Sequence, residues 1–316
     1  MKRVLSLTLV GLTLGAVGCV KPGERGGGKP GVLYLARHGQ TRWNRISQFQ
    51  GDPDLDQIGY LNRVSLWLLL KDEKLHAVYT SSKRRTQRTA ALVARQHGLA
   101  IRARAALDEI HSGVLEGICY KHMQPDTTKP GAADCDVPAQ GSRPALAMRA
   151  VQRIWAEAKA KGLAGRVPLG ENYADMVKRL SPLIPELKSA VGRGNVLAVG
   201  HGLINRVALH LLLGWSLDQV HKLRQENDQV YRISGLHGGK LMVELYTPGQ
   251  GWRRCSTPKK HQRRLDCSPP EAKPSGGKVF AVTKAPPAKT PPAKAPPAKA
   301  PPAKTPTSRP AAGSLP

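Results

Sequence analysis

Two short apolar segments, each ending in His-Gly, constrain the fold of this chain more than any other feature. Residues 31–39 read Gly-Val-Leu-Tyr-Leu-Ala-Arg-His-Gly, and residues 195–202 read Asn-Val-Leu-Ala-Val-Gly-His-Gly. Apolar runs of this length suit buried strands and are too short for the core of a helix. Open α/β sheets bind ligands beyond the carboxyl ends of their strands. We therefore expect His38 and His201 to face each other at one edge of a parallel sheet.

The rest of the chain from residue 31 onward alternates helix-like and strand-like patterns. This alternation predicts an α/β fold, a three-layer α/β/α sandwich around a mostly parallel central sheet. Pro182 and Pro185 are expected to bend or interrupt the helix that contains them. Helices are expected at residues 57–70, 85–97, 145–161 and 171–190, and strands at 75–79, 101–103 and 195–199, with a terminal hairpin of 230–234 and 241–246.

Two further segments carry charged side chains in the positions where such a sheet would present them. Residues 77–91 leave a strand and enter a helix rich in arginine, and residues 107–117 bring carboxylates on a loop punctuated by glycine. Arginine offers a rigid fork of donors that suits phosphate better than lysine does. The segments together therefore favour a site for an oxyanion.

In this order the segments resemble the histidine phosphatase superfamily, in the branch that includes phosphoglycerate mutases and fructose-2,6-bisphosphatases. The resemblance covers roughly residues 31–235 and implies a phosphoglycerate mutase-like fold. The matching residues are Arg37-His38-Gly39-Gln40-Thr41-x-x-Asn44, Gln50-Gly51, Leu55 to Gly59, Ser81-x-x-x-Arg85-Thr-x-Arg88, Leu107-x-Glu109-x-x-x-Gly113-x-x-Glu116-Gly117, Gly170-Glu171-x-x-x-Asp175-x-x-x-Arg179 and Gly200-His201-Gly202.

The resemblance also implies a role for each site residue. His38 would be the nucleophile, and Glu109 the proton donor, with Asp108 and Glu116 as alternatives. Spacing from Ser81 selects Arg85 over the neighbouring arginines 84 and 88, which are expected to be exposed helix residues. The phosphoryl group would be held by Arg37, Arg85 and His201, with Asn44, Thr41 and Gly202 as further binding residues.

The remaining eight histidines are expected to be surface or packing residues, with His111 and His122 kept as candidates for substrate contact. No metal and no cofactor is expected, because arginines would neutralise the phosphoryl oxygens.

The expected activity is hydrolysis of a small phosphorylated substrate, a phosphomonoester, through a phosphohistidine. One alternative is phosphoglycerate mutase-type transfer, in which the phosphoryl group returns to the substrate. Another is an envelope-anchored protein that binds phosphate without turnover. The sequence is compatible with all three functions, and it does not identify the substrate.

The amino-terminal residues resemble a bacterial export signal. Residues 1–18 combine a basic start with an apolar core, and residues 19–30 form a Gly-rich tether. The segment Ala-Val-Gly-Cys ending at Cys19 resembles a lipobox, which implies lipid attachment at this cysteine and a location in the cell envelope. Plain secretion without the lipid is the alternative.

Four cysteines remain after Cys19, and export would place them where disulfides persist. Local pairing of Cys119 with Cys135 and of Cys255 with Cys267 is preferred among three connectivities. Free thiols are the alternative.

Composition defines the two ends of the expected domain, residues 31–252. The tail at 253–316 is basic, rich in Pro, Ala and Lys, and expected to be disordered. The formal charge of +27 favours anionic partners, but no specific nucleic-acid motif accompanies it. The tail is either a spacer or a segment that adheres to an anionic envelope polymer. The insertion at 118–144 is either a roof over the site or a surface loop.

Overall fold

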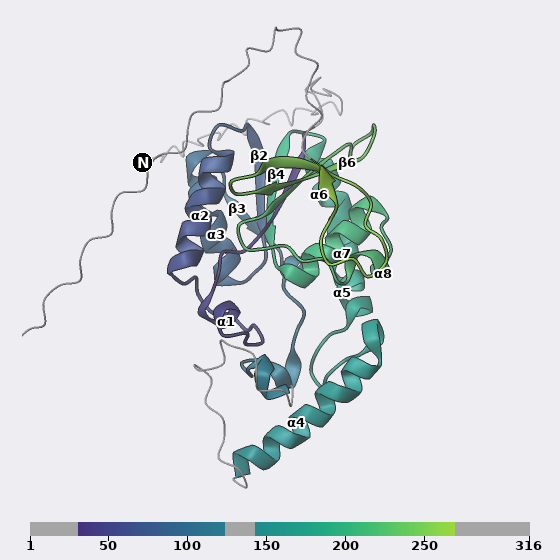
Figure 1. The fold of residues 1–316 in the computed structure, drawn as a ribbon. Helices are drawn as coiled ribbons and strands as arrows, with labels where there is room; N and C mark the ends of the chain where they lie inside the picture. Colours follow the sequence, from purple (N-terminus) through teal and green to yellow (C-terminus); the bar gives the residue numbers. More distant parts are fainter. Residues whose placement is uncertain (1–30, 124–142, 269–316) are drawn as a thin grey trace, which may run out of the picture. The chain divides into compact units, whose positions relative to one another are not determined.

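An eight-stranded sheet runs through the centre of the computed structural model, which describes residues 31–123 and 143–268 (Figure 1). The strand order is β3-β2-β4-β1-β5-β6-β7-β8. The first four strands in this order pair in parallel, and every pairing from β1·β5 onward is antiparallel. The strands are β1 Leu33–Arg37, β2 Leu75–Thr80, β3 Ile101–Ala103, β4 Asn195–Gly200, β5 Val230–Ser234, β6 Met242–Thr247, β7 Gly251–Cys255 and β8 Cys267–Ser268.

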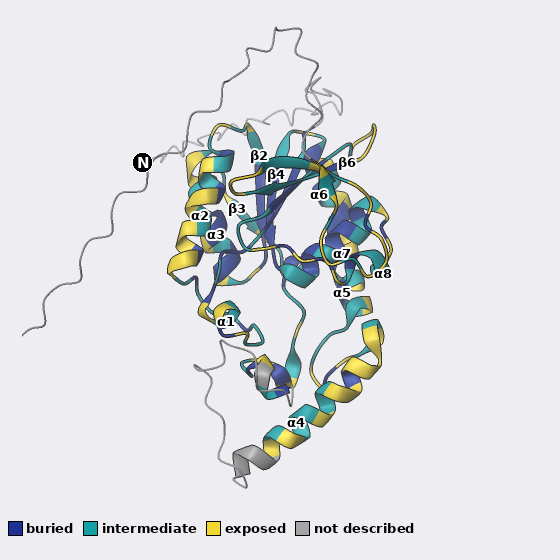
Figure 2. Cartoon of the chain, in the orientation of Figure 1, coloured by how far each residue is buried: buried dark blue, intermediate teal, exposed yellow. Residues whose placement is uncertain are grey.

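Helices cover both faces of the sheet, and alternate residues of each strand point to opposite faces. In β1, Tyr34 and Ala36 pack with α2 and α3, whereas Leu33 and Leu35 pack with α5, α6 and α7. Figure 2 shows the resulting pattern of buried strands between helices with exposed outer sides. The α-helices are α1 Arg42–Arg45, α2 Gln57–Leu70, α3 Arg84–Gln96, α4 Arg143–Ala160, α5 Tyr173–Leu180, α6 Ile184–Val191, α7 Gly202–Leu213 and α8 Leu217–Val220.

This architecture confirms the predicted three-layer α/β fold, but the sheet is mixed and not mostly parallel, because four antiparallel pairings, from β1·β5 to β7·β8, extend the parallel part. Residues 57–70 form a helix with the predicted bounds, and residues 171–190 are divided as expected by a 3₁₀ turn, Ser181–Leu183, next to the prolines. None of the helices in the described ranges is long and apolar enough to span a membrane. The amino-terminal signal, the tether with Cys19 and the repeats of the tail lie outside the described residues.

The sheet extends further toward the carboxyl terminus than the sequence pattern indicated. The expected domain boundary at residue 252 falls inside β7, and β8 adds a further strand at residues 267–268. Residues 253–268 therefore belong to the folded part and not to the tail. Composition concealed this because β7 reads Gly-Trp-Arg-Arg-Cys, a basic segment that resembles the tail, although it forms a tight hairpin with β6.

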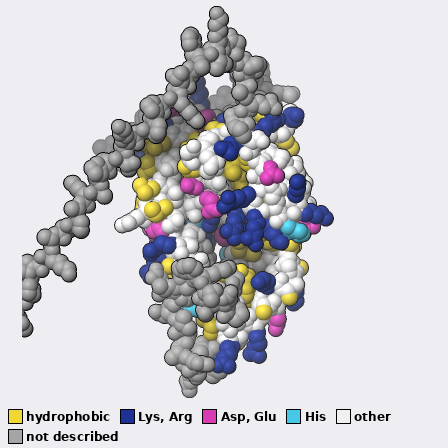
Figure 3. Space-filling view, viewed as in Figure 1, with side chains coloured by type: hydrophobic (Ala, Val, Ile, Leu, Met, Phe, Trp, Pro, Cys, Tyr) yellow, Lys and Arg dark blue, Asp and Glu magenta, His cyan; other side chains and the backbone are white. Residues whose placement is uncertain are grey.

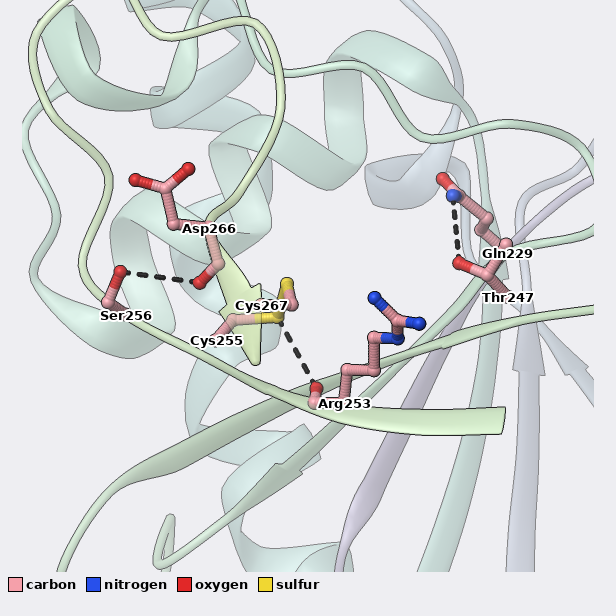
Figure 4. The surroundings of a disulfide bond; sticks show 7 residues. All are labelled: Gln229, Thr247, Arg253, Cys255, Ser256, Asp266 and Cys267. Atoms are coloured by element: carbon pink, nitrogen blue, oxygen red, sulfur yellow. Dashed lines mark hydrogen bonds between the residues drawn. A yellow bond between two sulfur atoms is a disulfide. The ribbon is translucent and has the colours of Figure 1, made fainter. Parts of the chain in front are cut away.

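A disulfide between Cys255 and Cys267 joins β7 to β8, which confirms one of the two predicted pairings. Figure 4 shows this bond together with the hydrogen bond from the Ser256 hydroxyl to the Asp266 carbonyl, at 3.3 Å. The loop at 256–266 is thus closed at its base. The predicted partner of Cys119, Cys135, lies outside the described residues, and that pairing stays a prediction.

The loop that follows β1 packs against the first turn of α2 at two glycines. A Cβ on Gly39 would lie 2.5 Å from the Gly59 carbonyl oxygen, and a Cβ on Gly59 would lie 2.0 Å from that of Gln40. Neither position has room for a side chain. The close approach holds the loop that carries His38 directly on the helix layer.

Residues 118 and 123, in the described part of the predicted insertion, join a satellite core that is formed mainly by neighbouring segments. Tyr120–Met123 is a 3₁₀ turn, and α4 follows residues 124–142, which lie outside the described ranges. Leu115, Met123, Ala158 and Val167 are buried together there. The described edge of the insertion therefore packs against the segment that contains Leu115, whereas its role as a roof stays a prediction.

Candidate active site

The two motif histidines lie side by side because the strands that precede them pair in parallel. Arg37 lies opposite Gly200 in the register of β1 and β4, and the backbone N–H of His38 donates to the Gly200 carbonyl at 3.0 Å. The next residue of each strand therefore reaches the same edge of the sheet. The ring centroids of His38 and His201 are 5.0 Å apart, and both residues are at most 1% exposed.

The His38 ring is held in a single tautomer. Its Nδ1 lies 2.7 Å from the carbonyl oxygen of Gly39, and a carbonyl can only accept. Nδ1 therefore carries the proton and donates. Nε2 of the neutral ring keeps its lone pair and is the nitrogen able to attack an electrophile.

Arg85 at the start of α3 is fully buried against the second histidine. Its Nε donates to Nδ1 of His201 at 3.2 Å, and its Nη1 donates to the Gly51 carbonyl at 2.6 Å. Nη2 is buried without a hydrogen-bond partner. The nearest carboxylate, on Asp52, lies 3.9 Å from Nη1. A buried guanidinium that retains an unused donor is suited to an anion, because buried polar groups are otherwise hydrogen-bonded.

Arg37 approaches the site from the last position of β1. Its Nη1 donates to the Gln225 carbonyl at 2.8 Å, and its Nε is buried without a partner. Gln225 itself is buried and donates to the Leu35 carbonyl at 3.0 Å. The sequence analysis did not find Gln225, since a lone glutamine outside the motifs carries no signal of its position.

Burial and positive charge keep both imidazoles neutral. Desolvation lowers the pKa of His38 well below 6.5, and the charges of Arg85 and Arg37 lower it further. The pKa of His201 is lowered in the same direction, first by burial and then by Arg85. Burial also lowers the pKa of each arginine, although nearby carboxylates oppose that shift. The site therefore combines buried guanidiniums with neutral rings.

A chain of hydrogen bonds fixes the tautomer of His201. Because Nδ1 accepts from Arg85, the ring proton is on Nε2, which donates to the Ser81 hydroxyl at 2.8 Å. Ser81 is 2.8 Å from the Thr86 hydroxyl, which donates to the Lys83 carbonyl at 2.8 Å. The motif serine thus positions the second ring, a role that spacing alone did not indicate.

The Glu109 carboxylate lies at the amino end of α7. It accepts from the backbone N–H groups of Leu203 and Ile204 at 3.2 Å, and from that of Ile110 at 3.0 Å. A Cβ on Gly202 would lie 3.8 Å from both Cζ of Arg37 and Oε2 of Glu109. Glu109 and Arg37 therefore converge on Gly202, immediately after His201.

The two alternative carboxylates are engaged elsewhere. Asp108 is buried and accepts from the backbone N–H of Ser82 at 2.7 Å and from its hydroxyl. Glu116 is exposed and lies against Gly51. Glu109 is thus the one of the three that the structure places beside Arg37.

Arg179 on α5 holds the loop that carries Glu109. Its Nη1 donates to the carbonyls of residues 105, 106 and 108, and Glu171 accepts from its Nε and Nη2 at 2.8 Å. Both residues belong to the late motif of the sequence. The motif indicated their importance, but only the fold shows that they position Glu109.

Thr41 and Asn44 make contacts within the first short helix. Thr41 is its N-cap, and its hydroxyl donates to Asn44 Oδ1 and lies 3.1 Å from Gln50 Oε1. The Asn44 side-chain oxygen also accepts from the Thr41 backbone N–H. Neither residue lines the cavity described below. Substrate binding by these two residues stays a prediction.

A cavity of about 890 Å³ opens beside the buried histidines. Arg37, Glu109 and Gly202 line it next to the His38–His201 pair, and Phe49 and Trp155 contribute an apolar wall. Figure 3 shows Lys and Arg side chains gathered in the middle of the face in view, above a hollow. The cavity is large enough to hold a phosphoryl group together with an organic group of several atoms.

The remaining histidines differ in whether they line this cavity. His76 and His97 pair with groups remote from the cavity, whereas His111 lines it and His122 does not. His221 and His261, expected at the surface or in packing, both line the cavity. His261 is exposed and packs edge-to-face against His221, as expected for surface and packing residues, but their position at the cavity had no signal in the sequence.

The described ranges contain no group of three His, Cys, Asp or Glu side chains arranged to hold a metal ion. Two guanidiniums with donors unused among the described residues suit a tetrahedral oxyanion, and the His38 ring presents the lone pair of Nε2 beside them. Both nitrogens of His201 are engaged by Arg85 and Ser81, so phosphoryl binding by this ring stays a prediction. The fold and this site define an α/β protein of the phosphoryl-handling class, in which a histidine can act as nucleophile.

Comparison with known proteins gives the family. The sequence model of the histidine phosphatase superfamily, branch 1, matches residues 33–161 and 138–247. The chain belongs to this superfamily. It is 26% identical over 204 residues to a protein named probable phosphoglycerate mutase GpmB from Erwinia tasmaniensis, covering 64% of this chain and 83% of the relative. A protein of the same name from Yersinia enterocolitica is also 26% identical over 204 residues.

Solved structures agree with this assignment. A mycobacterial glucosyl-3-phosphoglycerate phosphatase, in complex with VO3, is 25% identical with a TM-score of 0.50, covering 75% of this chain and 98% of that one. The α-ribazole phosphatase of Shigella flexneri shares the fold, with a TM-score of 0.52 at 21% identity, covering 64% of this chain and 90% of that one. The similar proteins are phosphatases and mutases, which supports an enzyme of the phosphatase type.

Both active-site rings are expected to stay neutral at pH 6.5 and to take up a proton only at more acidic pH, because burial and two arginines lower their pKa values. Long-range ¹⁵N–¹H spectra of the imidazoles would follow this titration, with His38→Gln and His201→Gln variants for assignment. A midpoint at or above pH 6.5 for either ring would contradict the electrostatics described here.

Proposed function

We propose that this chain hydrolyses a phosphomonoester through a phosphohistidine on Nε2 of His38. One observation carries the proposal: the neutral ring is fixed with its proton on Nδ1, between two arginines that each keep a buried donor without a partner. The bound phosphoryl oxygens would satisfy those donors and neutralise the two buried charges. The adjoining cavity would hold the leaving group.

In the first step Nε2 of His38 forms a bond to phosphorus, and the bond from phosphorus to the ester oxygen breaks. Arg37 and Arg85 stabilise the charge on the equatorial oxygens, since they are already in place and need no reorganisation. Glu109, beside Arg37 at Gly202, gives a proton to the departing oxygen.

In the second step water attacks the phosphohistidine from the side that the alcohol has left. Glu109, now a carboxylate, takes the proton of this water, and the bond between phosphorus and Nε2 breaks. Inorganic phosphate and the neutral ring are restored. His201 remains neutral throughout, because its two nitrogens are occupied by Arg85 and Ser81.

Mutase-type transfer is the second candidate, since relatives named phosphoglycerate mutase match 64% of the chain. It shares the first step and differs in the acceptor, which is a hydroxyl of the substrate and not water. The similarity to a phosphatase over 75% of the chain supports hydrolysis. Incubation with 3-phosphoglycerate separates the two candidates: isomerisation without phosphate release would favour the mutase.

Replacing His38 by alanine should reduce hydrolysis of p-nitrophenyl phosphate by about 10⁴-fold or more, because the covalent route is lost. Phosphate release is the measurement, and acid quenching of the wild type should trap acid-labile phosphate on residue 38. The matched control is His237→Ala, which removes an exposed histidine of the β5–β6 turn. Retained turnover in His38→Ala would disprove the proposed nucleophile.

Replacing Glu109 by glutamine should lower kcat for an alkyl phosphate by about 10²–10⁴-fold, because the alcohol then leaves without a proton. A nitrophenolate leaving group needs less protonation, so its phosphoenzyme should still form. Glu116→Gln, which changes an exposed carboxylate of the same loop, is the control. Equal losses for alkyl and nitrophenyl esters during phosphoenzyme formation would contradict the role of proton donor.

We also propose that the chain is exported and carries lipid on Cys19, which is supported by the basic start, the apolar run and the Ala-Val-Gly-Cys segment. Cells grown with labelled fatty acid should incorporate label into the wild type, and Cys19→Ser should lose it. Each buried methylene contributes roughly 0.8 kcal/mol to membrane binding, so the variant should also leave the membrane fraction. Unchanged labelling would refute lipid attachment at this residue.

A further inference from the structure

The cavity has a group of basic side chains that the proposed reaction at His38 does not use. Arg206, His221 and His261 all line it. Arg206 lies one helical turn after Gly202 on α7, about 6 Å further along the helix axis. These side chains come from three different segments of the chain, and their convergence therefore requires the tertiary structure.

Arg206 is a cation held in place without an acidic partner. Its Nη1 donates to the His221 carbonyl and lies 3.4 Å from the Tyr173 hydroxyl, which donates to the same carbonyl at 3.2 Å. Its Nε is buried and has no hydrogen-bond partner. Within residues 31–123 and 143–268 it forms no ion pair with a carboxylate. A positioned charge with an unused donor at a cavity wall is suited to an anionic ligand group.

His221 and His261 form a pair beside this arginine. The two rings are edge-to-face, with centroids 5.2 Å apart. Nδ1 of His221 donates to the Leu217 carbonyl at 3.0 Å, so Nε2 is the nitrogen left for a ligand. Protonation at Nε2 would turn this ring into a further donor toward an anion.

The disulfide-closed loop at 256–266 brings His261 to the cavity. Three hydrogen bonds attach the loop: the His261 N–H to the Asp218 carbonyl at 2.9 Å, the Arg224 N–H to the Arg263 carbonyl at 2.8 Å, and Gln219 Nε2 to the Pro258 carbonyl at 2.9 Å. His261 has a φ of 60°, a left-handed conformation that non-glycine residues rarely adopt and that is held only by surrounding structure. The loop follows residue 247, where the family match ends.

The other charged side chains on the cavity wall are of both signs. Lys159 and Arg224 add two cations, and Asp218 and Glu226 add two carboxylates. Glu171 also lines the cavity, but Arg179 neutralises it at 2.8 Å. Arg206 is thus a cation on this wall for which the described residues supply no ion pair, and the two imidazoles lie beside it.

We propose that Arg206, His221 and His261 form a second anion-binding subsite, so that the substrate is a phosphomonoester whose leaving group carries its own carboxylate or phosphate. This inference rests on the proposed phosphatase function. The phosphoryl group that is transferred binds at Arg37 and Arg85, and the second anion binds at the Arg206 cluster. The apolar wall of Phe49 and Trp155 accommodates the part of the molecule between them.

Matched substrates test the subsite. Glucose 6-phosphate and 6-phosphogluconate share a six-carbon chain and differ by a carboxylate remote from the phosphate, and fructose 6-phosphate and fructose 1,6-bisphosphate differ by a second phosphate. In at least one pair, we expect kcat/KM to be at least tenfold higher for the compound that carries the second anionic group. A preference in the first pair identifies a carboxylate site, and a preference in the second identifies a phosphate site.

Variants of the full chain show whether the preference belongs to these residues. Arg206→Gln and His261→Ala should each reduce the ratio of the two kcat/KM values to within about threefold of unity. The control Lys260→Ala changes an exposed neighbour on the same loop and should keep the ratio. Replacing both Cys255 and Cys267 by serine should lower the ratio as His261→Ala does, because the loop is no longer closed.

Binding to a His38→Ala background separates failure of this proposal from failure of the proposed reaction. Calorimetric titration with the same pairs measures the subsite even if the wild type turns over none of them. Tighter binding of the member with the second anion, by about tenfold and lost in Arg206→Gln, supports the subsite. Equal affinities within both pairs, or a preference that survives Arg206→Gln and His261→Ala, overturn it.

Discussion

Parallel pairing of β1 with β4 is the interaction on which the rest of the site depends. With Arg37 opposite Gly200, the residues that follow, His38 and His201, must emerge together at one sheet edge. Residues 163 positions apart thereby become neighbours with ring centroids 5.0 Å apart. The close contact of Gly39 with Gly59 holds the loop after β1 against α2. Helix α7 begins at Gly202, immediately after His201.

Burying two guanidiniums beside two imidazoles creates a site that is incomplete without an anion. Desolvation disfavours charge at this site, and both imidazoles are therefore neutral. Backbone carbonyls accept hydrogen bonds from only some of the arginine N–H groups. The remaining donors give the site its preference for negative charge. Glu109 lies beside Arg37 at Gly202, and the backbone N–H groups at the amino end of α7 hold its carboxylate in that place.

The superfamily domain, residues 33–247, and the segment after it, residues 248–268, contribute different parts of the structure. We call the second segment the carboxyl-terminal addition. The domain supplies the sheet edge, the arginines and the carboxylate, all within residues 33–247. The addition extends the sheet by two strands and closes a disulfide loop that reaches the cavity. The groups assigned to the proposed reaction thus lie in the shared part of the fold, whereas one residue outside it, His261, lines the cavity.

Sequence by itself determined the α/β class, the positions of His38, Arg37, Arg85, Glu109 and His201 in their elements, and the Cys255–Cys267 bond, because these depend on local periodicity, short spacings and motif order. It did not indicate Gln225, the hydrogen bond between Ser81 and His201, or the pairing of His221 with His261. It also placed the end of the domain at residue 252, inside β7. That boundary was misplaced because β7 is basic in composition. The contacts of Gln225, of Ser81 with His201 and of the histidine pair join segments distant in the chain, which only the packed tertiary structure brings together.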